Sequence, residues 1–253
     1  MIKKIGLQMW TLRETMNTPE DVRMSFRRMK ELGYDGAQTA DCHIPYEDYA
    51  RIAHEEGIEI WGTHDNLDLM INDIEKAIEL HKILGTKLMG IGGFSCDTVE
   101  QTKDFIKAAN KIGKRISKEG MKFTYHNHSH EFSRFPNGKT PMEMLEEGLD
   151  PETTSFVLDT YWVQHGGADI RYWMERLAGR IDLLHLKDMG KSREPDTQFI
   201  TEIGHGNLWW DGIIETAEKI GVKYYVVEQD ETPGDPFESI KFSSEYLHER
   251  YMK

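Results

Sequence analysis

The chain has 253 residues, of which 38% are hydrophobic, so it is long enough to bury one substantial core. It carries 44 acidic and 31 basic residues, and a formal net charge of −13 makes nucleic acid a poor partner because the surface repels phosphate backbones. Two separated cysteines, Cys42 and Cys96, argue against a disulfide framework and fit a reducing cytoplasm. No stretch approaches the roughly 18 apolar residues of a membrane span, so we expect no membrane association.

Short apolar runs recur along the chain, most of them opened by a glycine. The first run follows two lysines, but no long apolar segment comes after them, so we interpret it as a strand rather than as a signal peptide. Segments of helical period precede most of the others, and glycine just after a helix supplies its left-handed cap. Eight strands are therefore expected, within residues 4–10, 32–38, 56–62, 84–90, 119–125, 155–161, 178–186 and 220–228.

Helix starts are marked by a capping residue followed by proline, as at Thr18-Pro19, Thr140-Pro141 and Asp235-Pro236. Eight apolar strands alternating with helices predict an α/β fold, a (β/α)₈ TIM barrel, in a single domain over 1–253. The competing fold is an open doubly wound sheet, which usually shows a glycine fingerprint after its first strand. Here that position reads QMWTLRE, and no linker divides the chain.

Four consecutive strands end in a side chain that can bind a metal ion. The fifth to eighth strands end at His126, Asp159, His185 and Glu228, each after apolar residues. The active sites of these barrels lie at the carboxyl ends of the strands, so the four side chains should share one level. Two imidazoles and two carboxylates suit Mn²⁺, Zn²⁺, Fe²⁺ or Co²⁺.

The stretch FTYHNHSHEF, residues 123–132, places several titratable side chains around the end of the fifth strand. His128 should point to the same side as His126, because side chains alternate along a strand, and there it could contact metal or substrate. Glu131 follows on the loop as a candidate general acid or base. Which of these three residues is the ligand of strand five stays open at this level.

Lys187 follows His185 by two residues and should face the same interior. There it could bind a substrate hydroxyl or stabilise an enolate, and burial is expected to lower its pKa toward base chemistry. The alternative is a structural ion pair with Asp188 or Glu228. Residues expected to contact substrate are aromatic side chains at the mouth and histidines at strand ends or beside glycines: Trp10, His64, His128, Trp162, His165 and His205.

The motifs GLQMWTLRE, YHNHSHEF, VLDTYWVQHGGAD, LLHLKDM, EIGHGN and VVEQD resemble the sugar phosphate isomerase/epimerase family of xylose-isomerase-like TIM barrels. The resemblance implies a divalent metal, Mn²⁺ first, with Zn²⁺, Co²⁺, Fe²⁺ or Mg²⁺ as alternatives. Its ligands would be His126, Asp159, His185 and Glu228. Many relatives carry a glutamate on strand five, and their two metal-bound glutamates shuttle a proton. The histidine here looks more like the branch that includes inosose dehydratases.

The leading expectation is a metal-dependent sugar isomerase or epimerase acting on a small keto- or aldo-sugar. Glu228 or Glu131 would remove a proton next to the carbonyl, and Lys187 would hold the oxygens. The first alternative is a lyase or dehydratase that expels a β-hydroxyl or glycosidic oxygen from the same enolate. An endonuclease-type barrel and a sugar-binding protein without turnover are weaker alternatives. A homo-oligomer is compatible with the sequence.

Overall fold

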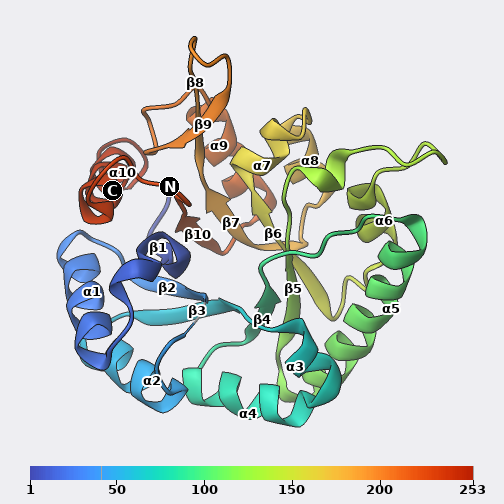
Figure 1. The fold of residues 1–253 in the computed structure, drawn as a ribbon, viewed down its shortest axis with the longest axis horizontal. Coiled ribbons are helices and arrows are strands. Elements are labelled where there is room, and N and C mark those ends of the chain that lie inside the picture. The colour runs from blue at the N-terminus through green and yellow to red at the C-terminus, as the bar shows by residue number, and fades with distance from the viewer. Residues whose placement is uncertain (41, 253) are drawn as a thin grey trace.

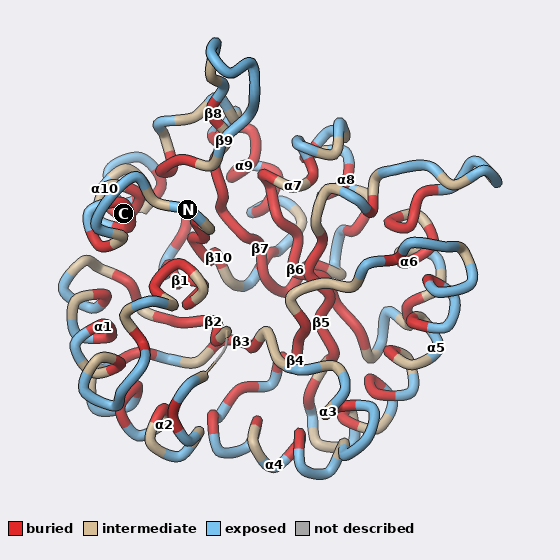
Figure 2. Tube along the Cα trace, in the orientation of Figure 1, coloured by how far each residue is buried: buried red, intermediate tan, exposed pale blue. Residues whose placement is uncertain are grey.

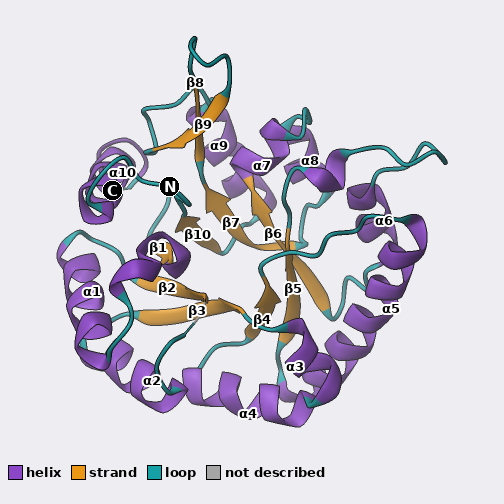
Figure 3. Cartoon of the chain, viewed as in Figure 1, coloured by secondary structure: helices purple, strands orange, loops and turns teal. Residues whose placement is uncertain are grey.

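The computed structural model describes residues 1–40 and 42–252. Eight parallel strands form the wall of a barrel, and helices surround it (Figures 1 and 3). The expected (β/α)₈ barrel in one domain is confirmed. In the order in which they neighbour one another, the strands are β3 (Glu59–His64), β2 (Gly36–Ala40), β1 (Ile5–Gln8), β10 (Tyr224–Val227), β7 (Ile181–Leu186), β6 (Thr154–Asp159), β5 (Lys122–His126) and β4 (Leu88–Ile91).

Several helices begin at side-chain caps that the sequence supplies. Thr18 and Thr140 each form a capping box, in which the threonine hydroxyl accepts from the third helical N–H and the acidic side chain there accepts in return. Among the described residues, no helix is both long and apolar enough to cross a membrane. The α-helices are α1 (Pro19–Glu31), α2 (Tyr46–Glu55), α3 (Leu67–Asn72), α4 (Ile74–Leu84), α5 (Val99–Ile116), α6 (Pro141–Gly148), α7 (Thr160–His165), α8 (Ile170–Arg176), α9 (Trp210–Ile220) and α10 (Pro236–Tyr251).

The barrel is nearly closed, and the two end strands of the sheet, β3 and β4, meet at a seam. No ladder pairing joins them among the described residues. They are instead linked near the carboxyl end, where the Asp65 N–H donates to the Gly90 carbonyl at 2.8 Å. The Gly90 N–H donates to the Thr63 hydroxyl at 3.2 Å. The seam is thus the least regular part of the wall.

The strands are buried on both faces, whereas the helices expose their outer sides (Figure 2). Outside the barrel, the strands pack against the helices in one large apolar core. Inside, a small cluster of Trp61, Leu88, Val157, Leu183 and Val226 fills the lower part. Side chains alternate along a strand, so a residue two positions after a member of this cluster also points into the barrel. Asp159, His185 and Glu228 follow Val157, Leu183 and Val226 in this way, and the apolar cluster therefore lies directly below the candidate ligands.

An antiparallel hairpin that the sequence analysis did not anticipate follows β7. It consists of β8 (Asp188–Lys191) and β9 (Gln198–Thr201), and it projects from the barrel at the top of Figure 1. Asp188 anchors its base by accepting hydrogen bonds from the backbone N–H groups of Gly204, Gly206 and Leu208 and from the Trp210 indole. Asp188 is therefore occupied by the loop and does not pair with Lys187.

Candidate active site

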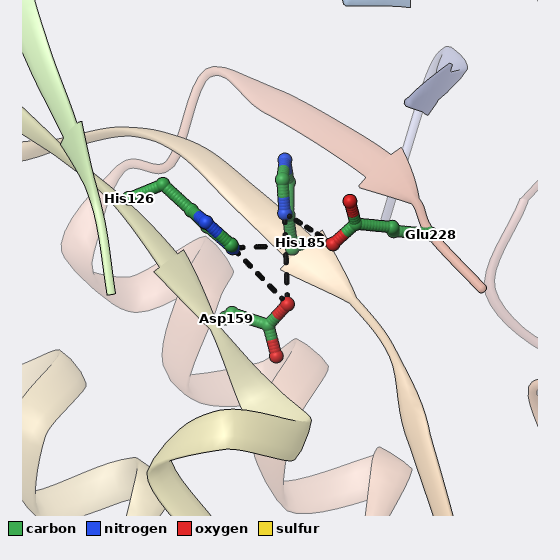
Figure 4. Close-up of side chains that lie close together, drawn as sticks. All are labelled: His126, Asp159, His185 and Glu228. Atoms are coloured by element: carbon green, nitrogen blue, oxygen red, sulfur yellow. Dashed lines mark hydrogen bonds and ion pairs between the residues drawn. The ribbon is translucent and has the colours of Figure 1, made fainter. Parts of the chain in front are cut away.

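The four expected ligand residues converge at the carboxyl ends of β5, β6, β7 and β10 (Figure 4). One donor atom from each lies within 4.8 Å of the others, and all four residues are buried. His126 Nε2 is 3.3 Å from Asp159 Oδ2, and His185 Nδ1 is 3.0 Å from Glu228 Oε2. The strand register explains this meeting, because Asp159 and His185 are direct neighbours across β6 and β7.

The outer nitrogen of each histidine is held by a group outside the cluster. His126 Nδ1 lies 2.9 Å from the Gly92 carbonyl, and His185 Nε2 lies 2.5 Å from Gln38 Oε1. An acceptor at the outer nitrogen fixes the proton there, so in a neutral imidazole the inner nitrogen presents its lone pair to the cluster. Gln38 is itself oriented by the Gln8 amide, which donates to the same oxygen at 2.9 Å.

Charges within the cluster keep the carboxylates ionised. Burial by itself raises the pKa of Asp159, but the charge of Lys187 and the two neighbouring imidazoles outweigh it and lower that pKa to about 2. Burial lowers the pKa of His185, but the Glu228 and Asp159 carboxylates raise it to about 9. A proton therefore occupies the inner nitrogen of His185 readily, and a metal ion would have to displace it.

Lys187 lies fully buried beside the cluster and contacts three carboxylates. Its Nζ is 2.6 Å from Asp230 Oδ2, 3.1 Å from Glu228 Oε2 and 3.5 Å from Asp159 Oδ2. Burial lowers the pKa of Lys187, but these three acids raise it above the ordinary value for lysine. The expectation of a lowered pKa is therefore wrong, because the sequence could not show how many carboxylates surround the ammonium group.

The donor set fits a divalent cation. Two imidazole nitrogens and two carboxylate oxygens are typical ligands of Mn²⁺, Zn²⁺ and Fe²⁺. His185 Nδ1 is buried and forms no hydrogen bond of good geometry, which leaves it directed at the centre of the cluster. His126, Asp159, His185 and Glu228 would hold the ion, with Gly92 and Gln38 as the outer partners of the histidines.

Two members of the cluster, His126 and Glu228, line a cavity of about 470 Å³, whereas Asp159 and His185 are fully buried and do not line it. Three of the residues expected to contact substrate, Trp10, His64 and His128, line it together with His126 and Glu228. Burial lowers the pKa of His64 and brings that of His128 to about 3, so both imidazoles are neutral. No sequence pattern predicted the other polar lining residues, of which Tyr46 begins α2 and Asp65, Asn66 and Asp230 come from loops.

Two more of the expected substrate residues lie beside the cavity without lining it. The Trp162 ring stands 5.0 Å from Lys187 Nζ and 5.3 Å from the His128 ring, so it closes the wall behind both. His165 is exposed, and its ring stacks on Tyr161 at 5.4 Å. Trp162 thus supports the cavity wall, and His165 stands one layer further out.

The structure does not bring Glu131 or His205 to the cavity. Glu131 is fully buried: Oε1 accepts from the Tyr125 hydroxyl at 2.7 Å and Oε2 accepts from the His128 N–H at 2.9 Å. Tyr125 alternates with His126 and packs on the outer side of β5 against Phe105. His205 packs its ring on Phe242, with centroids 3.6 Å apart, and Nδ1 lies 3.4 Å from Glu202.

Residues 26–249 match the family model of the xylose isomerase-like TIM barrels. The chain belongs to the xylose isomerase-like TIM barrel family. Among solved structures, a sugar phosphate isomerase/epimerase from Parabacteroides distasonis superposes with a TM-score of 0.85 at 25% identity, covering 98% of this chain and 94% of its own. An L-ribulose 3-epimerase superposes with a TM-score of 0.71 at 14% identity, over 97% and 93%, which shows the shared fold alone.

Curated relatives share part of the chain. An inosose dehydratase from Mesomycoplasma hyopneumoniae is 27% identical over 167 residues, which cover 59% of this chain and 55% of that protein. An inosose dehydratase from Bacillus cereus is 24% identical over 217 residues, covering 78% and 71%. The chain spans about half the length of the first of these relatives.

Proposed function

We propose that this protein is a divalent-metal-dependent enzyme that removes the proton next to the carbonyl of a keto-sugar or related cyclic ketone. The convergence of His126, Asp159, His185 and Glu228 carries the proposal, because the cluster opens to the cavity through His126 and Glu228. A cation bound there would polarise the carbonyl and acidify the neighbouring C–H. Mn²⁺ is our first choice, and the acidic, small cavity is suited to a sugar rather than to nucleic acid.

Glu228 is the proposed base. Its Oε2 contacts His185 and Lys187, and the residue also lines the cavity. The Glu228 carboxylate therefore connects the buried cluster with the space where a substrate would lie. Lys187 carries a positive charge next to it and would stabilise the negative charge that develops on the substrate oxygen. Trp162 and the cavity walls exclude water from this side.

The arrangement supports β-elimination best. The carboxylates around Lys187 lie on one side: Asp159 ends β6, and Glu228 and Asp230 follow β10, whereas the opposite side presents neutral imidazoles. Asp65, the other acid that lines the cavity, accepts from the Tyr46 hydroxyl and the Asn66 N–H. Proton loss and departure of an oxygen substituent can both occur on the carboxylate side, and the inosose dehydratase relatives support this outcome.

Aldose–ketose isomerisation is the second candidate, because one base can carry a proton between adjacent carbons. The similarity to a sugar phosphate isomerase/epimerase favours it. Epimerisation needs a second strong base on the opposite face, where His126 stands instead of a glutamate.

The test is incubation of the Mn²⁺-loaded protein with keto-sugars and inososes in D₂O, followed by NMR and mass spectrometry. We expect loss of the α-proton signal together with loss of water or of the β-substituent. A product that loses no water or substituent and gains only one deuterium, at the neighbouring carbon, would establish the isomerase instead. A protein that binds these compounds with metal present but never exchanges the α-proton would be a binding protein.

A further inference from the structure

A second hollow adjoins the main cavity. It measures about 440 Å³ and shares three lining residues with the main cavity: Asp65, Gly92 and His128. Each hollow lies in the range of about 300–1,000 Å³ that ligand sites occupy. The two hollows adjoin at these shared residues, so we treat them as two lobes, and we call the second, more open one the outer groove.

The outer groove has walls of mixed polarity. Leu67 and Phe94 give it apolar surface, and Ser95 and His130 give it polar surface. The Phe94 ring is backed by Phe105, with centroids 4.6 Å apart, so its position is fixed. His130 Nε2 lies 2.9 Å from the Phe94 carbonyl, which fixes the position of the His130 ring. Surfaces of this mixed kind suit a ring with apolar faces and polar edges.

His128 stands at the boundary between the lobes. Its ring faces His126 in the main cavity at 4.9 Å and stacks with His130 in the outer groove at 5.8 Å. Gly93 has a φ of +145°, and a Cβ there would lie 2.8 Å from the His128 ring. The backbone thus leaves room for this imidazole at the junction, where a ligand that fills both lobes would cross.

We propose that the natural substrate is a glycoside, with its ketone-bearing ring over the metal cluster and the glycosidically linked group in the outer groove. The inference rests on the proposed function and deepens it. The α-proton passes to Glu228, the C–H electrons form the new C=C bond, and the bond from the ring carbon to the glycosidic oxygen breaks. That oxygen takes up a proton and leaves as an alcohol. The two products together have the composition of the substrate, so no oxidant, reductant or water is consumed.

Binding and turnover test the proposal separately. Isothermal titration of the Mn²⁺-loaded protein compares a phenyl glycoside, which has no ketone and cannot react, with the free monosaccharide. We expect the glycoside to bind at least tenfold tighter. Ser95→Trp fills the outer groove and should abolish this preference without weakening the free sugar. Lys103→Trp, on the exposed outer face of α5, is the matched control and should keep the preference.

Leu67→Ala removes apolar surface from the same groove and should reduce the preference three- to tenfold. Equal affinities for both compounds, or a Ser95→Trp effect of the same size on both, would overturn the inference. If the protein binds the glycoside more tightly than the free sugar but turns over no keto compound, the proposed function alone is refuted. If the protein turns over a keto compound but binds the glycoside no more tightly than the free sugar, the glycoside proposal alone is refuted. If neither compound binds, the glycoside proposal and the proposed function are both refuted.

Discussion

Buried acids lie with their basic partners at opposite ends of the barrel, and their charges are balanced differently at the two ends. At the amino end, the Asp182 carboxylate faces two ammonium groups, Lys122 Nζ at 3.3 Å and Lys223 Nζ. At the carboxyl end, Asp159 and Glu228 share one buried lysine, Lys187, with two imidazoles. The lower group is satisfied by lysines that reach solvent. The upper group has more carboxylate charge than its one lysine neutralises, and a bound cation would balance the excess. This excess of negative charge distinguishes the functional end of the barrel from the structural end.

The largest expected difference between the two ends is in metal binding. Asp159→Ala should weaken Mn²⁺ binding by more than about 100-fold, since loss of even an outer partner of a ligand costs 10–100-fold. Asp182→Ala should leave metal affinity unchanged although it removes an equally buried acid. Metal content after dialysis and titration calorimetry measure both variants. Full occupancy in Asp159→Ala would show that the cluster is not the metal site.

The lysines should also behave differently. Lys187→Met leaves the Asp159 and Glu228 carboxylates without their counter-charge, and breaking a buried ion pair in this way costs about 3–5 kcal/mol of unfolding free energy. Mn²⁺ replaces the missing positive charge, so saturating metal should restore much of the loss. Urea unfolding with and without Mn²⁺ measures this, and Lys223→Met serves as the control that metal does not rescue. An equal loss with and without metal contradicts the charge argument.

A smaller effect is expected at Glu131. Glu131→Gln should leave metal content intact and keep kcat within about tenfold, with a larger change in KM, because the side chain holds the His128 backbone rather than the substrate. Tyr125→Phe breaks the neighbouring hydrogen bond, so the double variant should show non-additive effects on KM. A drop in kcat of about 100-fold or more with KM unchanged would make Glu131 a general acid or base after all.

The smallest effect concerns acid stability at the amino end. Burial raises the pKa of Asp182, but the Lys223 and Ser155 hydrogen bonds lower it below its ordinary value. The folded state then binds fewer protons than the unfolded chain, so this contribution is present above the unfolded pKa of about 3.9 and is lost as the pH falls below it. Asp182→Asn should flatten the decline of stability between pH 5 and 3. Urea midpoints across that range measure the slope, and an unchanged slope counts against the ion pairs.

The sequence predicts those parts of the site that depend on strand periodicity. His126, Asp159, His185 and Glu228 each end an apolar run, and the parallel register of a barrel brings such ends to one level. The same alternation predicts that Lys187 faces the interior, and in the structure it lies beside Asp159 and Glu228. The strands themselves were visible because glycine caps and apolar runs mark each β/α unit locally.

What the sequence could not predict comes from loops and from contacts between distant segments. Asp65 and Asp230 reach the cavity from loops whose path no periodic pattern encodes. Glu131 follows β5 by five residues, but a short 3₁₀ turn at His130–Phe132 directs it to the outer side of the strand. His205 lies beside glycines as expected, yet packing on Phe242 of α10, far along the chain, takes its ring away from the cavity.

The seam between β3 and β4 has a consequence for motion. Regular ladders hold the other strand pairs, whereas here two hydrogen bonds near the carboxyl end do most of the joining. Amide protons along these two edges should exchange with deuterated solvent sooner than those between β5 and β6. Asp65 and Gly92 stand just above the seam and belong to both lobes of the site. Local opening there would widen the passage between the lobes, so a bulky ligand should enter faster under conditions that speed exchange along the seam.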